Sequence, residues 1–431
     1  MNNKKVNIQK LIYKEFQRQN EELQLIPSEN FTSIQVRNTL GSVLVHKYSE
    51  GQIGKRYYEG NYIIDKIEKL CKDRALNLFG LKSDWHVNVQ PYSGSIANLA
   101  VYNSLLKPKD KIMGMYLYDG GHLSHGWKYK DKTVSLSSKI YKTAYYYVDS
   151  KTGVFNYDQV KKLVLKEKPK ILISGGTAYP REINHKRMSL IAKEYNTYYM
   201  ADIAHEAGLV ASGVNKSPFA YADIVTMTTH KTLRGPKGAM IFCKKKFAKE
   251  IDKSVFPGIQ GGPMNNNIAA IAVCLKEAQS KKFKQYSRQI IKNAKRLAKD
   301  LKKYNFNLIS GGTDKHLILI DLRNKNISGK YAAKALSISG IILNKNTIPS
   351  EPQSPINPSG IRLGTPTVTT RGMKEKQMPK IAKYIKDVID IASNFTQLEF
   401  KNFQEQLLKQ KNIIETKEKV RQLCYKFPLP K

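Results

Sequence analysis

Short apolar segments alternate with helical patterns between residues 87 and 244, and this rhythm dominates the middle of the chain. Each apolar segment is short enough to be a strand. The expected strands are Val87–Gln90, Lys111–Met115, Lys170–Ser174, Tyr198–Asp202, Asp223–Thr228 and Ala239–Cys243. Helical patterns between them include Ser95–Leu106 and His185–Tyr195. Strands and helices that alternate in this way predict an α/β fold, in which a mainly parallel sheet is covered by helices on both faces.

The remainder of the chain is mostly helical in pattern. We expect a long Lys-rich helical stretch over Asn266–Tyr304, a strand-like segment at His316–Leu322, and a polar, amphipathic, helical segment over Gln397–Lys419. A chain of 431 residues exceeds one ordinary core. The expected division is an N-terminal helical arm over 1–45, a large domain over 46–275 and a small C-terminal α+β domain over 276–431.

Composition excludes several classes of protein. Hydrophobic residues make up 41%, mean hydropathy is −0.47, and no apolar run approaches the roughly 18 residues of a membrane span. The basic N-terminal residues lack the apolar core of a secretory signal. The short chain before Leu25 favours the cytoplasm over the mitochondrion, which stays open. Four cysteines without a C-x-x-C pair argue against a zinc or thioredoxin-type site.

The charge balance is strongly basic, with 73 Lys and Arg against 35 Asp and Glu, or +38. Such a surface attracts polyanions, including nucleic acid. The lysines are spread along the whole chain, and no zinc-finger spacing or RNP-like motif accompanies them. Compositional drift therefore explains the excess better than a selected nucleic-acid surface, although binding remains possible.

Two polar residues follow expected strands at the edge of the sheet where ligands bind. Asp202 ends the strand Tyr198–Asp202, and Lys231 lies just after Asp223–Thr228. A lysine in this position is usually on the surface, and an aspartate there is often only a helix N-cap. Their common location at the carboxyl ends of strands is nevertheless what a cofactor site requires.

Two further segments could complete such a site. Ser93-Gly94-Ser95 precedes a helix and could bind phosphate through backbone N–H groups, although an ordinary N-cap looks the same. His122 follows two glycines that would let its ring approach a planar ligand, although a loop hydrogen bond is the commoner role. A lysine, a buried acid, a phosphate loop and a stacking group are what pyridoxal phosphate needs from a protein.

The amino-acid sequences of these segments, taken together, resemble one family. The matching motifs are Leu25–Phe31, Lys47–Gly51, Gly54–Tyr58, Gln90–Asn98, Gly120–Gly126, Asp202–Val210, Thr228–Pro236, Val255–Pro263 and Ser359–Thr370. In this order they resemble serine hydroxymethyltransferase, of the fold-type I (aspartate aminotransferase-like) pyridoxal phosphate enzymes. The resemblance implies a reversible conversion of serine and tetrahydrofolate to glycine and 5,10-methylenetetrahydrofolate.

The resemblance also implies residue roles around the cofactor. Lys231 would form the Schiff base, Asp202 would face the pyridine nitrogen and His122 would stack on the ring. The other expected cofactor contacts are His205 and Thr177 near the ring hydroxyl, Ser93, Gly94 and Ser95 at the phosphate, and Tyr48 and Gly262 from a partner subunit. The shared site would require a homodimer, or a tetramer built from dimers. No metal is implied.

Substrate contacts follow in the same way. Arg362 would bind the amino-acid carboxylate with Ser28, since a planar guanidinium suits a carboxylate. Glu50 would be the acid/base and would contact folate. The remaining expected residues are Tyr58 near the reacting carbon, Tyr57 as a further substrate contact, Thr228 and His230 as catalytic residues beside Lys231, and Leu117, Gly121, Leu123, Asn346, Ser354 and Ile356 at the folate.

Several positions depart from the family pattern. They are Pro27, Gln52, Ile53, Glu59, Lys237 and Ile356. Glu59 stands where the family has glycine, so a positive φ there would strain the backbone. Ile356 stands where the family commonly has phenylalanine, so less apolar surface would be offered to the ring of folate. These changes concern folate affinity and turnover rather than the type of reaction.

Two other functions stay open at this point. A pyridoxal phosphate aldolase could cleave β-hydroxy amino acids without folate. A catalytically weakened homologue could instead act as an RNA-binding or scaffold protein through its +38 surface.

Overall fold

The computed structural model describes residues 7–130 and 132–430. Its internal contacts divide the chain into two compact units. The sheet unit is Thr32–Arg288, and the terminal unit combines Met1–Phe31 with Gln289–Lys431. The N-terminal residues up to Phe31 thus group with the C-terminal part of the chain, which differs from the limits at 45 and 275 expected from the sequence.

A seven-stranded sheet forms the centre of the sheet unit, in the order β4-β12-β11-β10-β9-β5-β8. The strands are β4 (Trp85–Asn88), β5 (Lys111–Met115), β8 (Lys142–Tyr146), β9 (Ile171–Ser174), β10 (Tyr198–Asp202), β11 (Ile224–Thr228) and β12 (Ala239–Lys244). Neighbours pair in parallel, except that β12 is antiparallel to both β11 and β4. This sheet confirms the predicted α/β class. The edge strand β8 was not expected, because its alternating exposed and buried residues form no apolar run.

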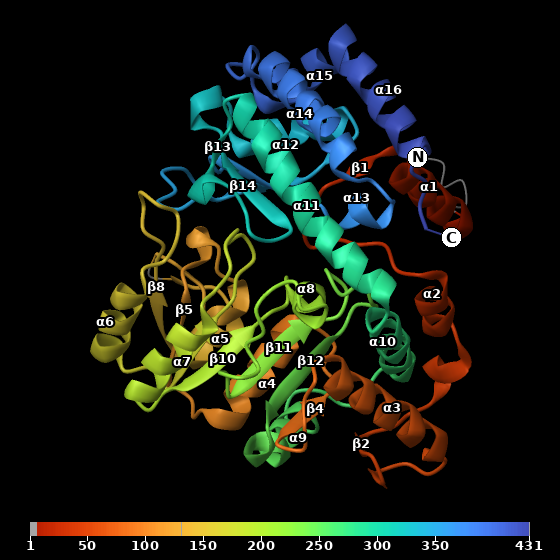
Figure 1. Cartoon of the computed structure of the whole chain (residues 1–431), viewed down its shortest axis with the longest axis vertical. Coiled ribbons are helices and arrows are strands. Elements are labelled where there is room, and N and C mark those ends of the chain that lie inside the picture. The colour runs from red at the N-terminus through yellow and green to blue at the C-terminus, as the bar shows by residue number, and fades with distance from the viewer. Residues whose placement is uncertain (1–6, 131, 431) are drawn as a thin grey trace, which may run out of the picture. The chain divides into compact units, whose positions relative to one another are not determined.

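Helices cover both faces of this sheet (Figure 1). Successive side chains of β10 point to opposite faces of the sheet, so Met200 and Tyr199 pack against different helices. Met200 belongs to the core shared with α4 (Gly94–Leu105) and α9 (Ala248–Val255). On the opposite face, the hydroxyl of Tyr199 lies 2.7 Å from Nδ1 of His185 in α7 (His185–Glu194). A strand buried on both sides explains the continuous apolar runs in the sequence.

Further elements surround this sheet. The helices are α2 (Ile34–Leu40), α3 (Tyr62–Leu78), α5 (Leu136–Ile140), α6 (Tyr157–Glu167), α8 (Ala207–Ala211) and α10 (Asn265–Ala278). Two hairpins pair β2 (Gly51–Gln52) with β3 (Lys55–Arg56) and β6 (Lys128–Tyr129) with β7 (Lys132–Thr133). Short 3₁₀ turns are η1 (Val43–His46), η2 (Leu117–Asp119), η3 (Leu123–His125) and η4 (Lys245–Phe247).

The expectation of one helical stretch over Asn266–Tyr304 was wrong. The chain forms two helices, α10 and α11 (Lys281–Lys303), with a break at Ser280. The Ser280 hydroxyl donates to the Glu277 carbonyl and accepts from the Phe283 N–H at 3.1 Å. Because serine offers the backbone these alternative partners, it ends one helix and begins the next.

The terminal unit contains an antiparallel sheet in the order β13-β14-β17-β16. Its strands are β13 (Asn307–Leu308), β14 (Leu317–Asp321), β16 (Asn344–Asn346) and β17 (Gly360–Gly364), and β1 (Leu23–Gln24) pairs with β15 (Ile341–Ile342). The helices and turns are α1 (Ile8–Glu21), α12 (Gly329–Ile338), α13 (Pro366–Thr370), α14 (Met378–Ser393), α15 (Phe400–Leu408), α16 (Lys411–Tyr425), η5 (Ile309–Gly311), η6 (Arg323–Lys325) and η7 (Glu375–Gln377).

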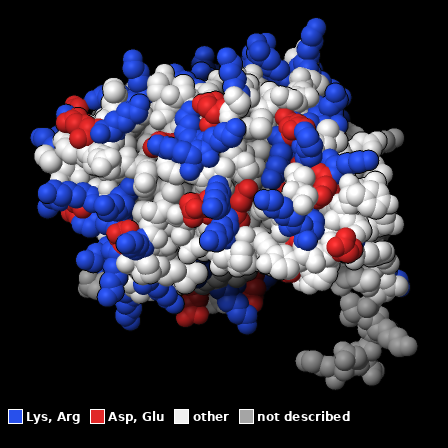
Figure 2. All heavy atoms as spheres, turned by 90° about the horizontal axis from the view of Figure 1, so that it is seen from below, with Lys and Arg blue, Asp and Glu red and all other residues white. Residues whose placement is uncertain are grey.

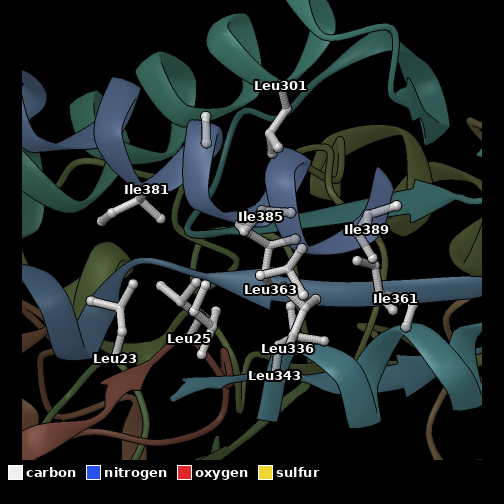
Figure 3. Close-up of a cluster of buried hydrophobic side chains, with 14 of the residues drawn as sticks. Leu23, Leu25, Leu301, Leu336, Leu343, Ile361, Leu363, Ile381, Ile385 and Ile389 are labelled. Atoms are coloured by element: carbon white, nitrogen blue, oxygen red, sulfur yellow. The ribbon is translucent and has the colours of Figure 1, made fainter. Parts of the chain in front are cut away.

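The core of the terminal unit is a cluster of buried aliphatic side chains (Figure 3). Ile381, Ile385 and Ile389 recur every four residues along α14 and so share one face of that helix. They belong to the same cluster as Ile361 and Leu363 of β17. This packing fixes the strand that carries Arg362.

The segment Gln397–Lys419 is mostly helical, as expected, but it is not one continuous helix. The segment forms α15 and α16, which are separated at Lys409 and Gln410. Leu407 before the break and Ile413 after it are both buried in the core of the terminal unit. Two helices with separate directions let both apolar faces reach this core.

Basic side chains are spread over the surface. Figure 2 shows Lys and Arg scattered over the visible face, with fewer Asp and Glu among them. Among the residues described, no helix combines the length and apolar character needed to cross a bilayer.

Candidate active site

A buried carboxylate lies at the end of the central strand β10. Asp202 is 9% exposed, and its Oδ2 accepts from Asn98 Nδ2 at 2.8 Å and lies 3.0 Å from His125 Nε2. Its Oδ1 accepts from the Ala204 N–H at 3.0 Å. Burial alone would raise the pKa of Asp202, but the bond and charge of His125, the charge of His122 and the Asn98 amide hold this pKa well below its usual range. Asp202 is therefore a buried anion.

Asn98 connects the elements that surround this anion. From helix α4, its amide donates to Asp202 and to the hydroxyl of Ser124, both at 2.8 Å. Its carbonyl oxygen accepts from the Thr226 hydroxyl of β11 at 2.8 Å. We assigned Asn98 and His125 no role from the sequence. Both lie inside matching motifs, but only the fold brings them to Asp202.

The loop after β5 carries His122 to the same place. His122 Nδ1 accepts from the Ser124 N–H at 3.2 Å and lies 2.7 Å from the Ser124 hydroxyl, which orients the ring. The Thr177 N–H donates to the Gly120 carbonyl at 2.7 Å, and its hydroxyl donates to the Gly121 carbonyl at 2.8 Å. The structure thus brings His122, Gly121 and Thr177 together beside Asp202.

The loop of Lys231 is fixed by backbone and hydroxyl contacts. The Thr228 hydroxyl donates to the Ala204 carbonyl at 3.1 Å, and the Thr232 hydroxyl donates to the His205 carbonyl at 2.9 Å. These bonds join the end of β11 and the loop after it to the residues after β10, and the two strands lie side by side (Figure 1). Lys231 is 9% exposed and His205 is buried. Lys231 is therefore a buried lysine on a rigid loop, and His205 belongs to the same assembly.

The segment Ser93-Gly94-Ser95 begins α4 next to this loop. Ser93 caps the helix by accepting from the Ile96 N–H. A Cβ added at Gly94 would lie only 2.8 Å from Cγ2 of Thr228. Helix α4 therefore approaches the end of β11 at a distance that favours glycine.

His230 precedes Lys231 and is mostly buried. Burial, together with the charges of Lys231 and Lys237, lowers the pKa of His230 to about 4. The imidazole is therefore neutral at physiological pH.

A second cluster surrounds Glu50. The rings of Tyr48 and Tyr58 meet edge to face at 5.2 Å, and Gly262 lies against Tyr48, since a Cβ there would be 3.2 Å from its ring. A Cβ on Gly261 would lie 3.1 Å from Oε1 of Glu50. Tyr57, the expected substrate contact beside Tyr58, packs on Phe256 and is 76% exposed.

The Tyr92 side chain links the Glu50 cluster to the start of α4. Its hydroxyl donates to the Gly262 carbonyl. Burial raises the pKa of Tyr92, and the neighbouring Tyr48 and Glu50 raise it further. Tyr92 directly precedes Ser93, so the cluster approaches the segment Ser93-Gly94-Ser95 within the sheet unit.

The terminal unit brings together the expected carboxylate-binding residues. Arg362 lies on β17, and its Nε donates to Asn344 Oδ1 at 3.0 Å. The Gly364 N–H donates to the Leu25 carbonyl at 2.7 Å, and Pro27 packs against Gly364, which brings Ser28 to the same strand. Burial lowers the pKa of Arg362 to about 10, so the guanidinium stays charged at neutral pH.

The expected folate positions fall in both units. In the terminal unit, Asn346 lies on β16, and Ser354 and Ile356 lie in the following loop, where Lys345 donates to the Ile356 carbonyl. In the sheet unit, Leu117 and Leu123 lie in the 3₁₀ turns on either side of Gly121. Ile356 and Leu123 are 71% and 49% exposed, so both present apolar surface to solvent.

Two of the departures from the family pattern, Glu59 and Gln52, have defined contacts in the fold. Glu59 is not among the described residues with positive φ, and the left-handed position is Gly60, with φ +74°. The condition for strain at Glu59 is therefore not met. Its carbonyl accepts from Lys47 Nζ at 2.7 Å. Gln52 Oε1 accepts from Lys72 Nζ at 3.5 Å.

Comparison with known protein families matches residues 1–385 to the family described as serine hydroxymethyltransferase. This match covers most of the 431-residue chain. The chain belongs to the serine hydroxymethyltransferase family. It is a pyridoxal phosphate-dependent glycine hydroxymethyltransferase that uses serine, glycine and tetrahydrofolate. The match supports neither the folate-independent aldolase nor the RNA-binding scaffold.

The sheet unit of this hydroxymethyltransferase fits pyridoxal phosphate. A buried anion, a buried lysine and a glycine-containing helix start meet at the ends of neighbouring parallel strands. His122, His125 and Asp202 also place ligand atoms within 4.8 Å of one another, a spacing that a metal could use. The Asp202 oxygens, however, already accept from Asn98, His125 and Ala204. A carboxylate has about four acceptor positions, and the one that remains suits a single cationic ring N–H.

The lowered pKa of His230 makes folding stability depend on pH. Between about pH 4 and pH 6.5 the unfolded chain binds more protons at this residue than the folded chain, so stability falls as pH is lowered through this window. We expect His230→Asn to reduce that loss by about 1–3 kcal/mol. Urea unfolding at pH 7 and pH 4.5 gives the free energy of unfolding at each pH, and the difference between the two is the loss to be compared. His46→Asn, at an exposed histidine, is the control, and an unchanged pH dependence in His230→Asn contradicts the assignment.

Proposed function

We propose that the residues brought together in the sheet unit carry out the family reaction in this chain, with Lys231 as the lysine that bonds to the cofactor. The observation that supports this most strongly is the buried, ionised Asp202 at the centre of the sheet. Pyridoxal phosphate, when bound, supplies an electron sink for negative charge at the amino-acid Cα. Asp202 would keep the ring nitrogen protonated, and His122 would lie against the ring.

Proton transfer is the work proposed for Glu50. Serine and tetrahydrofolate give glycine, methylenetetrahydrofolate and water, so the serine Cα–Cβ bond breaks and the hydroxyl proton must be accepted. The carboxylate of Glu50 is half-buried beside Gly261 and can take this proton. Tyr58, in ring contact with Tyr48, would orient the reacting carbon.

Substrate binding is the role proposed for Arg362 and Ser28. The guanidinium would form two parallel bonds with the carboxylate of serine or glycine, and burial strengthens such a pair. The bond from Arg362 Nε to Asn344 at 3.0 Å would hold the guanidinium in place on β17 for this purpose. Asn346, Ser354, Ile356, Leu117, Gly121 and Leu123 are proposed as folate contacts.

We also propose a homodimer with shared active sites. Part of the sheet unit presents apolar and aromatic side chains to solvent, among them Val43, Tyr57 and Tyr62, which are 76%, 76% and 72% exposed. Such groups mark interaction surfaces. Tyr48 and Gly262 lie in the same region, so a partner's copies of them could complete the phosphate site. The four buried free thiols fit a reducing compartment, and we propose the cytoplasm.

Replacement of Lys231 tests the proposed chemistry. We expect Lys231→Ala to abolish serine cleavage and the visible absorption of lysine-bound cofactor, because no other group at that position can form the bond. Lys216→Ala, at an exposed lysine, is the matched control and should behave like the parent enzyme. Full turnover by Lys231→Ala would rule out the proposed role.

Mixed dimers test the shared site. A Lys231→Ala chain and a Tyr48→Ala chain, co-expressed with different tags and purified as the heterodimer, should restore about half of the parent activity. One of the two sites then carries both substitutions and the other carries neither. If each site is built from one chain, both sites are defective and the heterodimer is no more active than the two variants alone.

A further inference from the structure

The backbone around Glu50 is fixed at every carbonyl from Lys47 to Gly51. The donors are Asn265 Nδ2 to Lys47 at 2.6 Å, Asn61 Nδ2 to Tyr48 at 3.3 Å, Arg56 Nη1 to Ser49 at 2.9 Å, the Tyr57 N–H to Glu50 at 3.1 Å, and Arg56 Nη1 to Gly51 at 2.8 Å. Exposed loops rarely have each successive carbonyl paired in this way, and backbone that is paired moves less.

Arg56 makes the two bonds on either side of Glu50. Its Nη1 binds the carbonyls of Ser49 and Gly51, the residues before and after Glu50. Its other nitrogens bind carboxylates of α3: Nε lies 2.8 Å from Asp65 and Nη2 lies 2.8 Å from Glu68. The planar guanidinium therefore connects the Glu50 backbone to a helix, with its own side chain only 4% exposed.

The carboxylates behind Arg56 are themselves anchored. Glu68 is fully buried, accepts from Gln90 Nε2 at 3.1 and 3.2 Å, and lies 3.3 Å from Lys72 Nζ. Gln90 also donates to the Gly51 carbonyl at 3.1 Å. A buried charge that is paired and hydrogen-bonded stays in one position.

Gly51 completes the arrangement directly after Glu50. Its φ is +102°, and a Cβ there would lie 2.3 Å from the Lys55 carbonyl oxygen. Only glycine fits this turn, which returns the chain to Arg56 through the β2–β3 pair. The first strand of this hairpin, β2, directly follows Glu50, and the second, β3, contains Arg56. The hairpin therefore places Arg56 beside the carbonyls that it binds.

We infer that Arg56 is a positioning residue for the reaction: it fixes the backbone of Glu50 so that the carboxylate meets the serine hydroxyl. This inference rests on the acid/base role proposed for Glu50. Proton transfer depends steeply on placement, and an error of about 1 Å can cost about 100-fold in rate. Arg56 acts through Glu50 and contacts neither substrate nor cofactor.

A double-mutant cycle between Arg56 and Glu50 tests this inference. In the holoenzyme we expect Arg56→Lys to lower kcat about 10- to 100-fold, because lysine cannot reproduce the four bonds, while the KM for serine and the cofactor absorption change little. In a Glu50→Gln background the same substitution should cost no more than about twofold. Arg74→Lys is the matched control. Arg74 lies on α3 and also donates to a backbone carbonyl, that of Ala272 in α10 at 2.7 Å, but it is outside the Glu50 segment.

The outcomes separate the two proposals. If Glu50→Gln keeps full kcat, the proposed role of Glu50 fails, and with it the target of Arg56. If Glu50→Gln loses turnover but Arg56→Lys keeps it, the positioning role is overturned while the proposed function stands. The same conclusion follows if Arg56→Lys lowers kcat as much in the Glu50→Gln background as in the parent enzyme. Should Arg56→Lys fold poorly, Asp65→Asn removes one anchor at a more exposed carboxylate, 22% exposed, and must show the same coupling to Glu50.

Discussion

The buried negative charge of Asp202 is the constraint on which the site depends. Asp202 ends β10, the middle strand of the seven-stranded sheet, and is only 9% exposed. A carboxylate there stays ionised only if its neighbours compensate it. Asn98 comes from the helix on one side and His125 from the loop on the other. Asn98 also binds the Ser124 hydroxyl and the Thr226 hydroxyl of β11, so compensation of this one charge connects several elements of the site.

Several features of this arrangement could be predicted from the sequence. The bounds of β5 and β10 agree with their apolar runs, because strands buried on both faces leave an uninterrupted signal. Asp202 and Lys231 could be placed at strand ends for the same reason. The edge strand β8 left no such run, and the breaks at Ser280 and Gln410 lay inside continuous helical patterns.

The contacts that tune the site could not be predicted. Asn98 and Asp202 are 104 residues apart, and periodicity carries no information on which side chains meet over that separation. Arg56 is a similar case, since its motif was recognised but its bonds to Ser49 and Gly51 depend on the hairpin that returns the chain. The backbone strain considered for Glu59 does not arise, because the left-handed position is the next residue, Gly60.

Proton exchange at glycine tests the central claim, that the buried anion at Asp202 makes the bound cofactor an electron sink. The holoenzyme is incubated with glycine in D₂O, with and without tetrahydrofolate, and loss of the glycine methylene signal is followed by NMR. The account predicts folate-accelerated exchange in the parent enzyme and exchange slower by about 100-fold or more in Asp202→Asn with cofactor still bound. Exchange at the parent rate in Asp202→Asn would contradict it.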